Sequence, residues 1–220
     1  VLKALLDGGH LHGDTLTLDG RTLAQALADA PAPDGDIVVP ASSPLHPSGG
    51  VVVLKGSLCP DGALLKIAGL KSLRFEGTAR VFDGEEACVE AVRRRDYREG
   101  DVLVIRYEGP RGGPGMRALL TDGRFSGATR GMCIGYACPE AQAGGAIALV
   151  RDGDRILIDA VDARIELLIE ADELQRRRQA WQPRDVGRLG GVLEKYARLV
   201  GPANEGALTH SGVPLSALDT

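Results

Sequence analysis

Two loops crowded with glycine and proline contain the residues whose types and spacing could do chemistry. The first loop runs from Tyr107 to Met116 and the second from Thr121 to Gly127. Glycine clusters mark tight turns or the close approach of backbone to a ligand. The second loop presents one serine, Ser126. Its spacing alone favours a turn residue, because a serine acts as a base only where a metal or strong dipoles stabilise its alkoxide.

The first loop does not match a phosphate-binding motif. A P-loop requires Gly-Lys followed by Ser or Thr, whereas residues 112–115 are Gly-Gly-Pro-Gly. Pro110 and Pro114 also lack the N–H groups that hold anions in such loops. The sequence therefore argues against nucleotide binding.

The four cysteines do not form a recognisable metal or cluster site. Cys133 and Cys138 have the C-x4-C spacing that begins a plant-type iron–sulfur pattern, but the third cysteine is missing. Cys59 precedes a turn proline, and Cys88 lies on the apolar face of a predicted helix. Structural zinc needs four clustered ligands, so buried structural thiols in a reducing cytoplasm are the favoured interpretation.

The histidines add no ligand set. His10 and His12 are close together but have no third ligand nearby, and His46 and His210 lie in predicted loops. A Ser–His–Asp triad stays open, although no G-x-S-x-G elbow supports it.

Composition limits the classes of function. The 220 residues could form one large domain or two small ones, and the formal net charge of −4 without a basic face argues against nucleic acid as a partner. We find no apolar stretch long enough to span a bilayer and no secretory signal, so we expect a cytoplasmic protein without membrane association. The first residues read as the end of a helix that stops at Gly8, as in a piece of a longer protein.

Apolar periodicity predicts strands in the middle of the chain and helices at its flanks, which is typical of a mixed β-barrel or sandwich with peripheral helices. The triplets Arg93–Arg95 and Arg176–Arg178 are interpreted as solvated helix ends. The Asp152-Gly153 pair predicts a hairpin turn between the strands on either side of it. Strands or strand-like runs are expected at 37–39, 51–54, 63–68, 102–105, 146–150, 155–158 and 165–169, and helices at 22–30, 84–95 (with a capping box from Asp83 and Glu86), 172–181 and 186–200.

The order of short motifs then decides the interpretation. The motifs lie at residues 48–50, 54–63, 75–82, 106–116, 121–131, 138–141, 144–145 and 193–198. In this order they resemble the carboxy-terminal domain of the iron–sulfur dihydroxy-acid and sugar-acid dehydratase family, over nearly the whole chain. The resemblance implies a mixed α/β fold, with a β-barrel of the swivelling type flanked by peripheral helices at 51–220. Residues 1–50 would be a helix end, a short helix and a Pro/Gly/Ser-rich connection from a missing amino-terminal domain.

The resemblance also implies a reaction. Family members dehydrate a 2,3-dihydroxy acid to a 2-keto acid, with an iron–sulfur cluster on the departing hydroxyl, Mg²⁺ holding the substrate and a serine alkoxide removing the C2 proton. Ser126 occupies the position of that catalytic serine in the Asp-Gly-Arg-Phe-Ser-Gly motif. The motif wording resembles the enzyme of valine and isoleucine biosynthesis. A sugar-acid dehydratase, or an inactive barrel serving as an assembly module, is the alternative.

Two departures from the family pattern matter. The cluster-ligating cysteines and most metal ligands of the family belong to the amino-terminal domain, which we expect as the partner of this chain within one protein. The resemblance separately implies that the whole protein is a homodimer or tetramer. In addition, residues 117–120 replace a longer segment whose first glutamate contributes to the metal site. That glutamate has no counterpart, so no metal ligand is assigned, and Glu108 is expected to support the loop. Either the segment is deleted or the sequence joins the two sides of a disordered loop. We expect the chain alone to be inactive.

Overall fold

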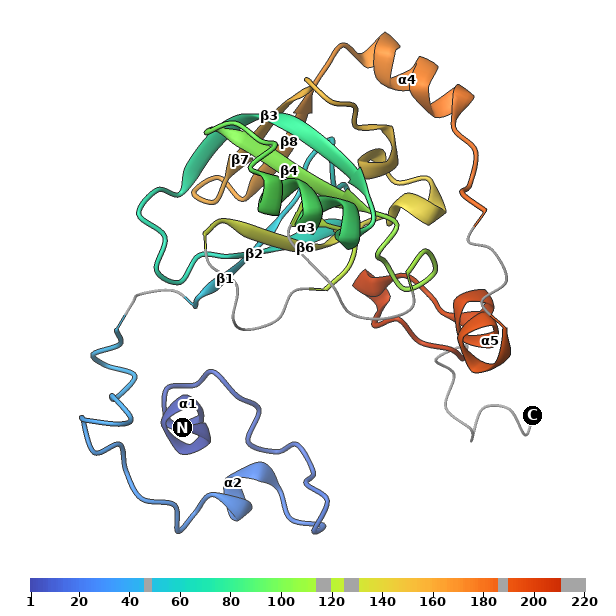
Figure 1. Cartoon of the computed structure of the whole chain (residues 1–220). Helices are drawn as coiled ribbons and strands as arrows, with labels where there is room; N and C mark the ends of the chain where they lie inside the picture. Colours follow the sequence, from blue (N-terminus) through green and yellow to red (C-terminus); the bar gives the residue numbers. More distant parts are fainter. Residues whose placement is uncertain (46–48, 114–119, 125–130, 186–189, 211–220) are drawn as a thin grey trace. The chain divides into compact units, whose positions relative to one another are not determined.

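A computed structural model describes residues 1–45, 49–113, 120–124, 131–185 and 190–210. The chain divides into two units, Val1–Gly49 and Gly50–Thr220 (Figure 1). Within the described residues, no helix has the length and apolar character that a membrane crossing requires.

The first unit is built from two short helices and turns. Helix α1 (Leu2–Asp7) ends at Gly8, as predicted, and α2 (Leu23–Ala26) is shorter than the expected helix at 22–30. The capping box of α2 is complete, because Thr22 and Gln25 each accept the backbone N–H of the other. The strand-like run at 37–39 is not a strand, since a carboxylate oxygen of Asp34 accepts three successive N–H groups and holds a turn. Among the described residues of this unit, only Ala4 is buried.

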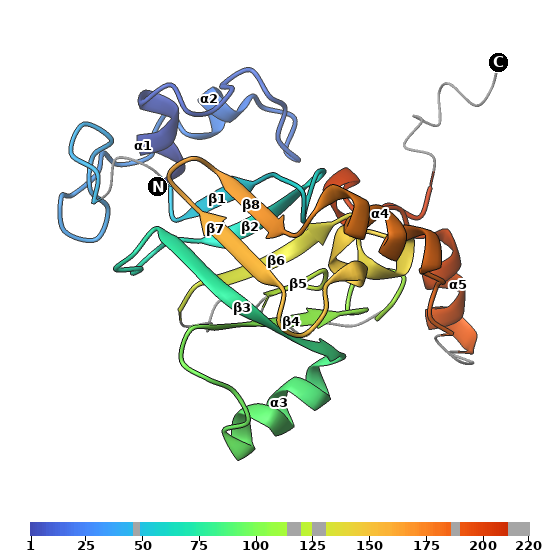
Figure 2. The same ribbon diagram turned by 90° about the horizontal axis from the view of Figure 1, so that it is seen from above.

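An eight-stranded sheet forms the second unit, in the order β1-β2-β6-β5-β4-β3-β7-β8 (Figure 2). A parallel bridge joins its two outer strands, with Lys55 N donating to Ala163 O and Ile165 N to Lys55 O, both at 3.0 Å. The sheet is therefore a nearly closed barrel, which confirms the predicted barrel. The strands are β1 (Val51–Leu54), β2 (Gly62–Lys66), β3 (Arg74–Asp83), β4 (Asp101–Arg106), β5 (Leu120–Thr121), β6 (Cys133–Cys138), β7 (Arg155–Asp159) and β8 (Arg164–Leu168).

Four neighbouring strands of this barrel run parallel. Helix α3 (Glu85–Arg94) connects β3 to β4 as a parallel crossover, and β5 and β6 continue the same direction. The carboxyl ends of β3, β4, β5 and β6 therefore meet at one edge, where the loops that follow these strands come together. The other helices of this unit are α4 (Ala171–Ala180) and α5 (Gly191–Leu199), with 3-10 turns η1 (Ala141–Ala143), η2 (Ala146–Leu149) and η3 (Ala203–Glu205).

Apolar side chains from every side of the barrel fill its interior. Leu54, Leu65, Val104, Ile134 and Ile156 are fully buried there. Burial of such side chains supplies most of the free energy that stabilises a domain of this size. The barrel is thus a packed core, and its loops at the carboxyl edge are the parts free to carry chemistry.

The four cysteines are buried and carry free thiols, as predicted. Burial raises the pKa of Cys88 to about 11, and it raises the pKa of Cys59 and of Cys138 as well. Burial thus makes the thiolate forms of these three cysteines costly, which suits packed structural thiols.

Several predicted elements are wrong in type or extent. Residues 146–149 form the 3-10 turn η2 and not a strand. The prediction was wrong because a short, fully buried apolar run has no periodicity that distinguishes a strand from a helical turn. The predicted hairpin at Asp152-Gly153 is therefore absent, and β7 pairs with β8. The prediction assigned no strand to residues 74–83 or 133–138, which form β3 and β6. Of the expected helix at 186–200, residues 186–189 lie outside the described residues, and α5 begins at Gly191.

Candidate functional site

The carboxyl edge of the parallel strands gathers three carboxylates, those of Asp122, Glu108 and Glu140. Asp122 directly follows β5, Glu108 follows β4 by two residues, and Glu140 follows β6 by two residues. Asp122 is 1% exposed and Glu140 4% exposed, whereas Glu108 is half-buried. The parallel direction of the strands brings these side chains together although they are far apart in the chain.

Asp122 binds the backbone of all three loops. Its carboxylate accepts N–H from Tyr107 at 3.2 Å, from Glu108 at 3.0 Å and from Ala141 at 2.7 Å. Two further bonds hold the short segment that carries it, since Gly123 N donates to Thr121 Oγ1 and Tyr136 N donates to Gly123 O. The loops after β4, β5 and β6 are thus fixed to one another through one carboxylate.

The other two carboxylates also accept backbone N–H groups. Glu140 accepts the N–H of Arg111, at 3.1 and 3.2 Å to its two oxygens. Glu108 accepts the N–H of Glu85, the first residue of α3, at 3.0 Å. A carboxylate at a helix amino terminus is favoured by the free N–H groups and by the helix dipole.

The contact of Glu108 with α3 bears on the role predicted for this residue. The predicted cap of α3 is wrong. Glu108 supports its loop by joining it to α3, as expected. The capping box from Asp83 and Glu86 does not form, because Gly84 is the N-cap and has no side chain. The Asp83 carboxylate pairs instead with Arg106.

Burial raises the pKa of Asp122, Glu108 and Glu140 above the ordinary values of these acids, and the charge of Asp122 adds to the shift of the other two. The hydrogen bonds from backbone N–H groups oppose the shift in each case. The three carboxylates are therefore desolvated, and backbone N–H groups compensate for part of that cost. We call Asp122, Glu108 and Glu140, with the backbone groups that they bind, the hub.

A pocket of about 280 Å³ opens beside this hub. Its polar lining combines two of the carboxylates with a cation and two phenols. The lining includes Glu108, Asp122, Arg124, Tyr136 and Tyr196, with backbone from Gly109, Gly123 and Gly206. Such a mixture suits a small polar ligand better than an apolar one.

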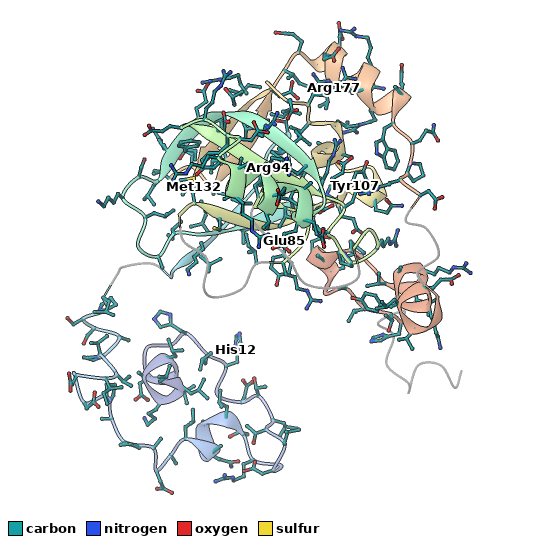
Figure 3. The ribbon with its side chains drawn as sticks, in the orientation of Figure 1. His12, Glu85, Arg94, Tyr107, Met132 and Arg177 are labelled. Carbon is teal, nitrogen blue, oxygen red and sulfur yellow. The ribbon has the colours of Figure 1, made fainter. Side chains whose placement is uncertain are left out.

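Tyr107 adds a second link from this hub to the outside of the barrel (Figure 3). Its ring lies 5.6 Å from the guanidinium of Arg106 and 5.5 Å from that of Arg184. Both separations are within the range of cation–π attraction. The ring joins the segment after α4 to the loop after β4.

The predicted catalytic residue, Ser126, lies outside the described residues, as do residues 114–116 of the first loop. The described part of the second loop, residues 121–124, belongs to the hub. Across the described ranges, no group of three or more His, Cys, Asp or Glu side chains could hold a metal ion.

The sequence prediction missed Asp122, Glu140 and Tyr136 as members of the site. Asp122 and Glu140 were visible only as parts of the motifs at 121–131 and 138–141. Recognising β6, and the parallel course of β4, β5 and β6, would have placed all three residues at one edge.

Loops at the carboxyl edge of parallel strands are where enzymes of mixed α/β fold commonly place their binding sites. Comparison with known proteins identifies the family. The chain belongs to the dihydroxy-acid/6-phosphogluconate dehydratase family, whose carboxy-terminal model matches residues 36–121 and 117–207. These two matches cover most of the second unit.

Curated relatives agree with the family match. The chain is 63% identical to dihydroxy-acid dehydratase 2 of Bordetella bronchiseptica over 230 residues, which cover 96% of the chain and 40% of the relative. It is 56% identical to dihydroxy-acid dehydratase 3 of Bradyrhizobium diazoefficiens and 54% identical to the dihydroxy-acid dehydratase of Parvibaculum lavamentivorans, with the same coverage. The chain thus spans about 40% of the length of these relatives.

The comparisons also bear on the short connection between the two loops. The alignment to the Bordetella bronchiseptica relative is 230 residues long, although the chain has 220, so this relative contains residues that the chain lacks. The family model matches in two stretches that overlap at residues 117–121. This break coincides with the connection that the motif analysis identified as shortened.

Proposed function

We propose that the chain is the carboxy-terminal part of a dihydroxy-acid dehydratase, which converts a 2,3-dihydroxy acid to a 2-keto acid and water. The observation that carries the proposal is 63% identity to a protein of that name across 96% of the chain. The hub at the carboxyl edge supports it, because the motif at 121–127 begins within that hub.

In this proposal Ser126 is the base. Removal of the C2 proton leaves its electron pair to form the C2–C3 double bond, the C3–O bond breaks, and the hydroxyl leaves as water once protonated. The enol then tautomerises to the 2-keto acid. Asp122, four residues before Ser126, holds the start of that loop, and Glu108 and Glu140 hold the neighbouring loops.

We propose an iron–sulfur cluster and Mg²⁺ as cofactors of the whole protein, but the described residues of this chain do not fit as their ligands. Across the described residues, no group of three or more His, Cys, Asp or Glu side chains is placed to hold a metal ion. Burial also raises the pKa of Cys59, Cys88 and Cys138, so the thiolate that a ligand needs is costly to form at these positions. The ligands would come from the amino-terminal domain, which is the proposed partner of this chain.

We further propose that residues 1–50 connect that domain to the barrel. The carboxy-terminal family model begins to match only at residue 36, and the described part of Val1–Gly49 buries a single residue, Ala4. A segment with so little interior of its own needs another surface to pack against. A homodimer or tetramer, the cytoplasm as location and a role in valine and isoleucine biosynthesis complete the proposal.

The test is Ser126→Ala in the full-length protein. Turnover of 2,3-dihydroxyisovalerate should fall at least a thousandfold, while iron and sulfide content stay unchanged. Activity that survives the substitution would exclude Ser126 as the base. Faster turnover of an aldonic acid by the unaltered protein would instead favour a sugar-acid dehydratase.

The chain by itself should be inactive with the same substrate, because neither the partner domain nor the segment shortened at 117–120 is present. Turnover by the purified 220-residue chain would overturn that expectation.

A further inference from the structure

A bulge interrupts strand β6 at the site. In the pairing with β2, Gly62 lies opposite Cys138 and Leu64 lies opposite Gly135. One residue of β2, Ala63, is therefore matched by two residues of β6, Tyr136 and Ala137. Bulges of this kind redirect a side chain and occur often beside active sites.

Tyr136 has an unfavourable backbone conformation at this bulge. Its φ is +56°, in the left-handed region that glycine adopts freely and that an aromatic residue rarely occupies. A glycine would form the same bulge with less strain, so backbone geometry alone does not explain a tyrosine here. Strained residues held by their surroundings cluster at functional sites.

The surroundings of Tyr136 hold its backbone firmly. Its N–H donates to Gly123 O at 2.8 Å, and Gly123 is the residue that follows Asp122. The strained tyrosine is therefore attached directly to the hub that fixes the three loops.

Tyr136 is one of the residues that line the 280 Å³ pocket, together with Glu108, Arg124 and Tyr196. A pocket of this size accommodates a small metabolite of a few carbon atoms. Arg124 supplies a cation for a carboxylate, and a phenol can donate to or accept from a hydroxyl or a carboxylate oxygen.

We infer that Tyr136 is a substrate-contact residue, whose hydroxyl forms a hydrogen bond with an oxygen of a small hydroxy acid bound in this pocket. The inference rests on the proposed function for the class of ligand. The bulge supplies the direction of the side chain, and the tie to Gly123 supplies its fixed position.

The experiment compares Tyr136→Phe with the unaltered full-length protein. The substitution keeps the ring and the bulge and removes only the hydroxyl. Loss of one neutral hydrogen bond to the substrate should raise KM about five- to tenfold, with kcat changed less than twofold. A purely structural role would leave KM unchanged and alter thermal stability instead.

Two control variants separate the hydroxyl from general effects. Tyr97→Phe removes a phenol that is 46% exposed and outside the pocket lining, so KM should not change. Ala163→Gly relieves a positive φ of 52° in the turn between β7 and β8, so it should preserve or raise stability with no change in KM. Tyr136→Gly should keep the circular dichroism spectrum of the fold and raise KM at least as far as Tyr136→Phe.

The outcomes distinguish the two proposals. An active protein whose KM is the same with Tyr136→Phe overturns the role of Tyr136 and leaves the proposed function intact. An unaltered full-length protein that does not turn over any 2,3-dihydroxy acid overturns the proposed function, and with it the ligand assigned to this pocket.

Discussion

The carboxylate of Asp122 accepts the backbone N–H of Ala141 at 2.7 Å, which attaches the loop after β5 to the turn after β6. The same carboxylate accepts the N–H groups of Tyr107 and Glu108, from the loop after β4. One buried side chain thus sets the relative positions of three loops that are separated in sequence by up to 34 residues.

Asp122→Asn should destabilise the barrel unit. Asparagine has one acceptor oxygen where the carboxylate has two, so at least one of the three N–H groups loses its partner. Because a hydrogen bond to a charged group contributes more than a neutral one, while the amide is less costly to bury, we expect a net loss of about 1–2 kcal/mol. Urea unfolding measures it, and the exposed Asp61→Asn is the control, with an expected change under about 0.5 kcal/mol.

The stability of the barrel unit should increase as pH is lowered from neutral towards the ordinary pKa values of its buried acids. The pKa values of Glu108, Asp122 and Glu140 are raised by burial above their ordinary values of 4.5, 3.8 and 4.5. Between the unfolded and folded pKa values the folded state binds more protons, so the free energy of unfolding falls as pH rises through that window.

Groups with the opposite shift act in a lower pH range. Hydrogen bonds from the N–H of Asp162 and from Arg177 lower the pKa of Asp159 and of Glu173, respectively, so their contributions are lost only as pH falls below the ordinary values of 3.8 and 4.5. Urea unfolding at pH 5, 6 and 7 measures how the free energy of unfolding changes with pH, and Glu140→Gln should make that change smaller. Stability that instead rises with pH in the unaltered chain would contradict the burial of these acids.

Gly145→Ala should be strongly destabilising. A Cβ at this position would overlap the carbonyl oxygen of Pro139, which belongs to the backbone and cannot move aside. Gly145 N also donates to Glu140 O at 3.0 Å, so a shift of residue 145 disturbs the turn that carries Glu140. We expect a loss of about 2–3 kcal/mol in thermal unfolding. Gly49→Ala, where a Cβ meets no atom within 4 Å, should change stability little. Equal effects at both positions would refute the close approach at Pro139.

Arg177→Met should cost far more than Arg176→Met. The Arg177 side chain is 9% exposed, forms an ion pair with the equally buried Asp154 and donates to Leu149 O (Figure 3). Removing it leaves a buried carboxylate unpaired, a change that typically costs about 3–5 kcal/mol. Arg176 is 74% exposed and pairs only with Glu173 among the described residues, so its loss should cost less than about 1 kcal/mol. Thermal unfolding of both variants at low and high salt measures the difference. Similar losses of stability in the two variants would show that Arg177 is solvated, as the sequence predicted.

The sequence by itself determined much of the barrel. Apolar runs bounded by turn residues, such as 51–54 and 102–105, predicted β1 and β4. The expected burial of 51–54 is wrong for Val51 and Val53, which are exposed. The motifs with Ser126 identified the family, since the order of many short segments is more specific than any one of them.

Tertiary structure decided what local pattern does not encode. Residues 146–149 are as apolar as a strand but form a 3-10 turn, and the Arg177 side chain is buried although its neighbours Arg176 and Arg178 are exposed. Asp122, Glu108 and Glu140 are 14 to 32 residues apart, and only the parallel course of β4, β5 and β6 brings them to one edge. The physical reason is that local sequence sets which faces are apolar, whereas pairing between distant strands sets which carboxylates share a desolvated space.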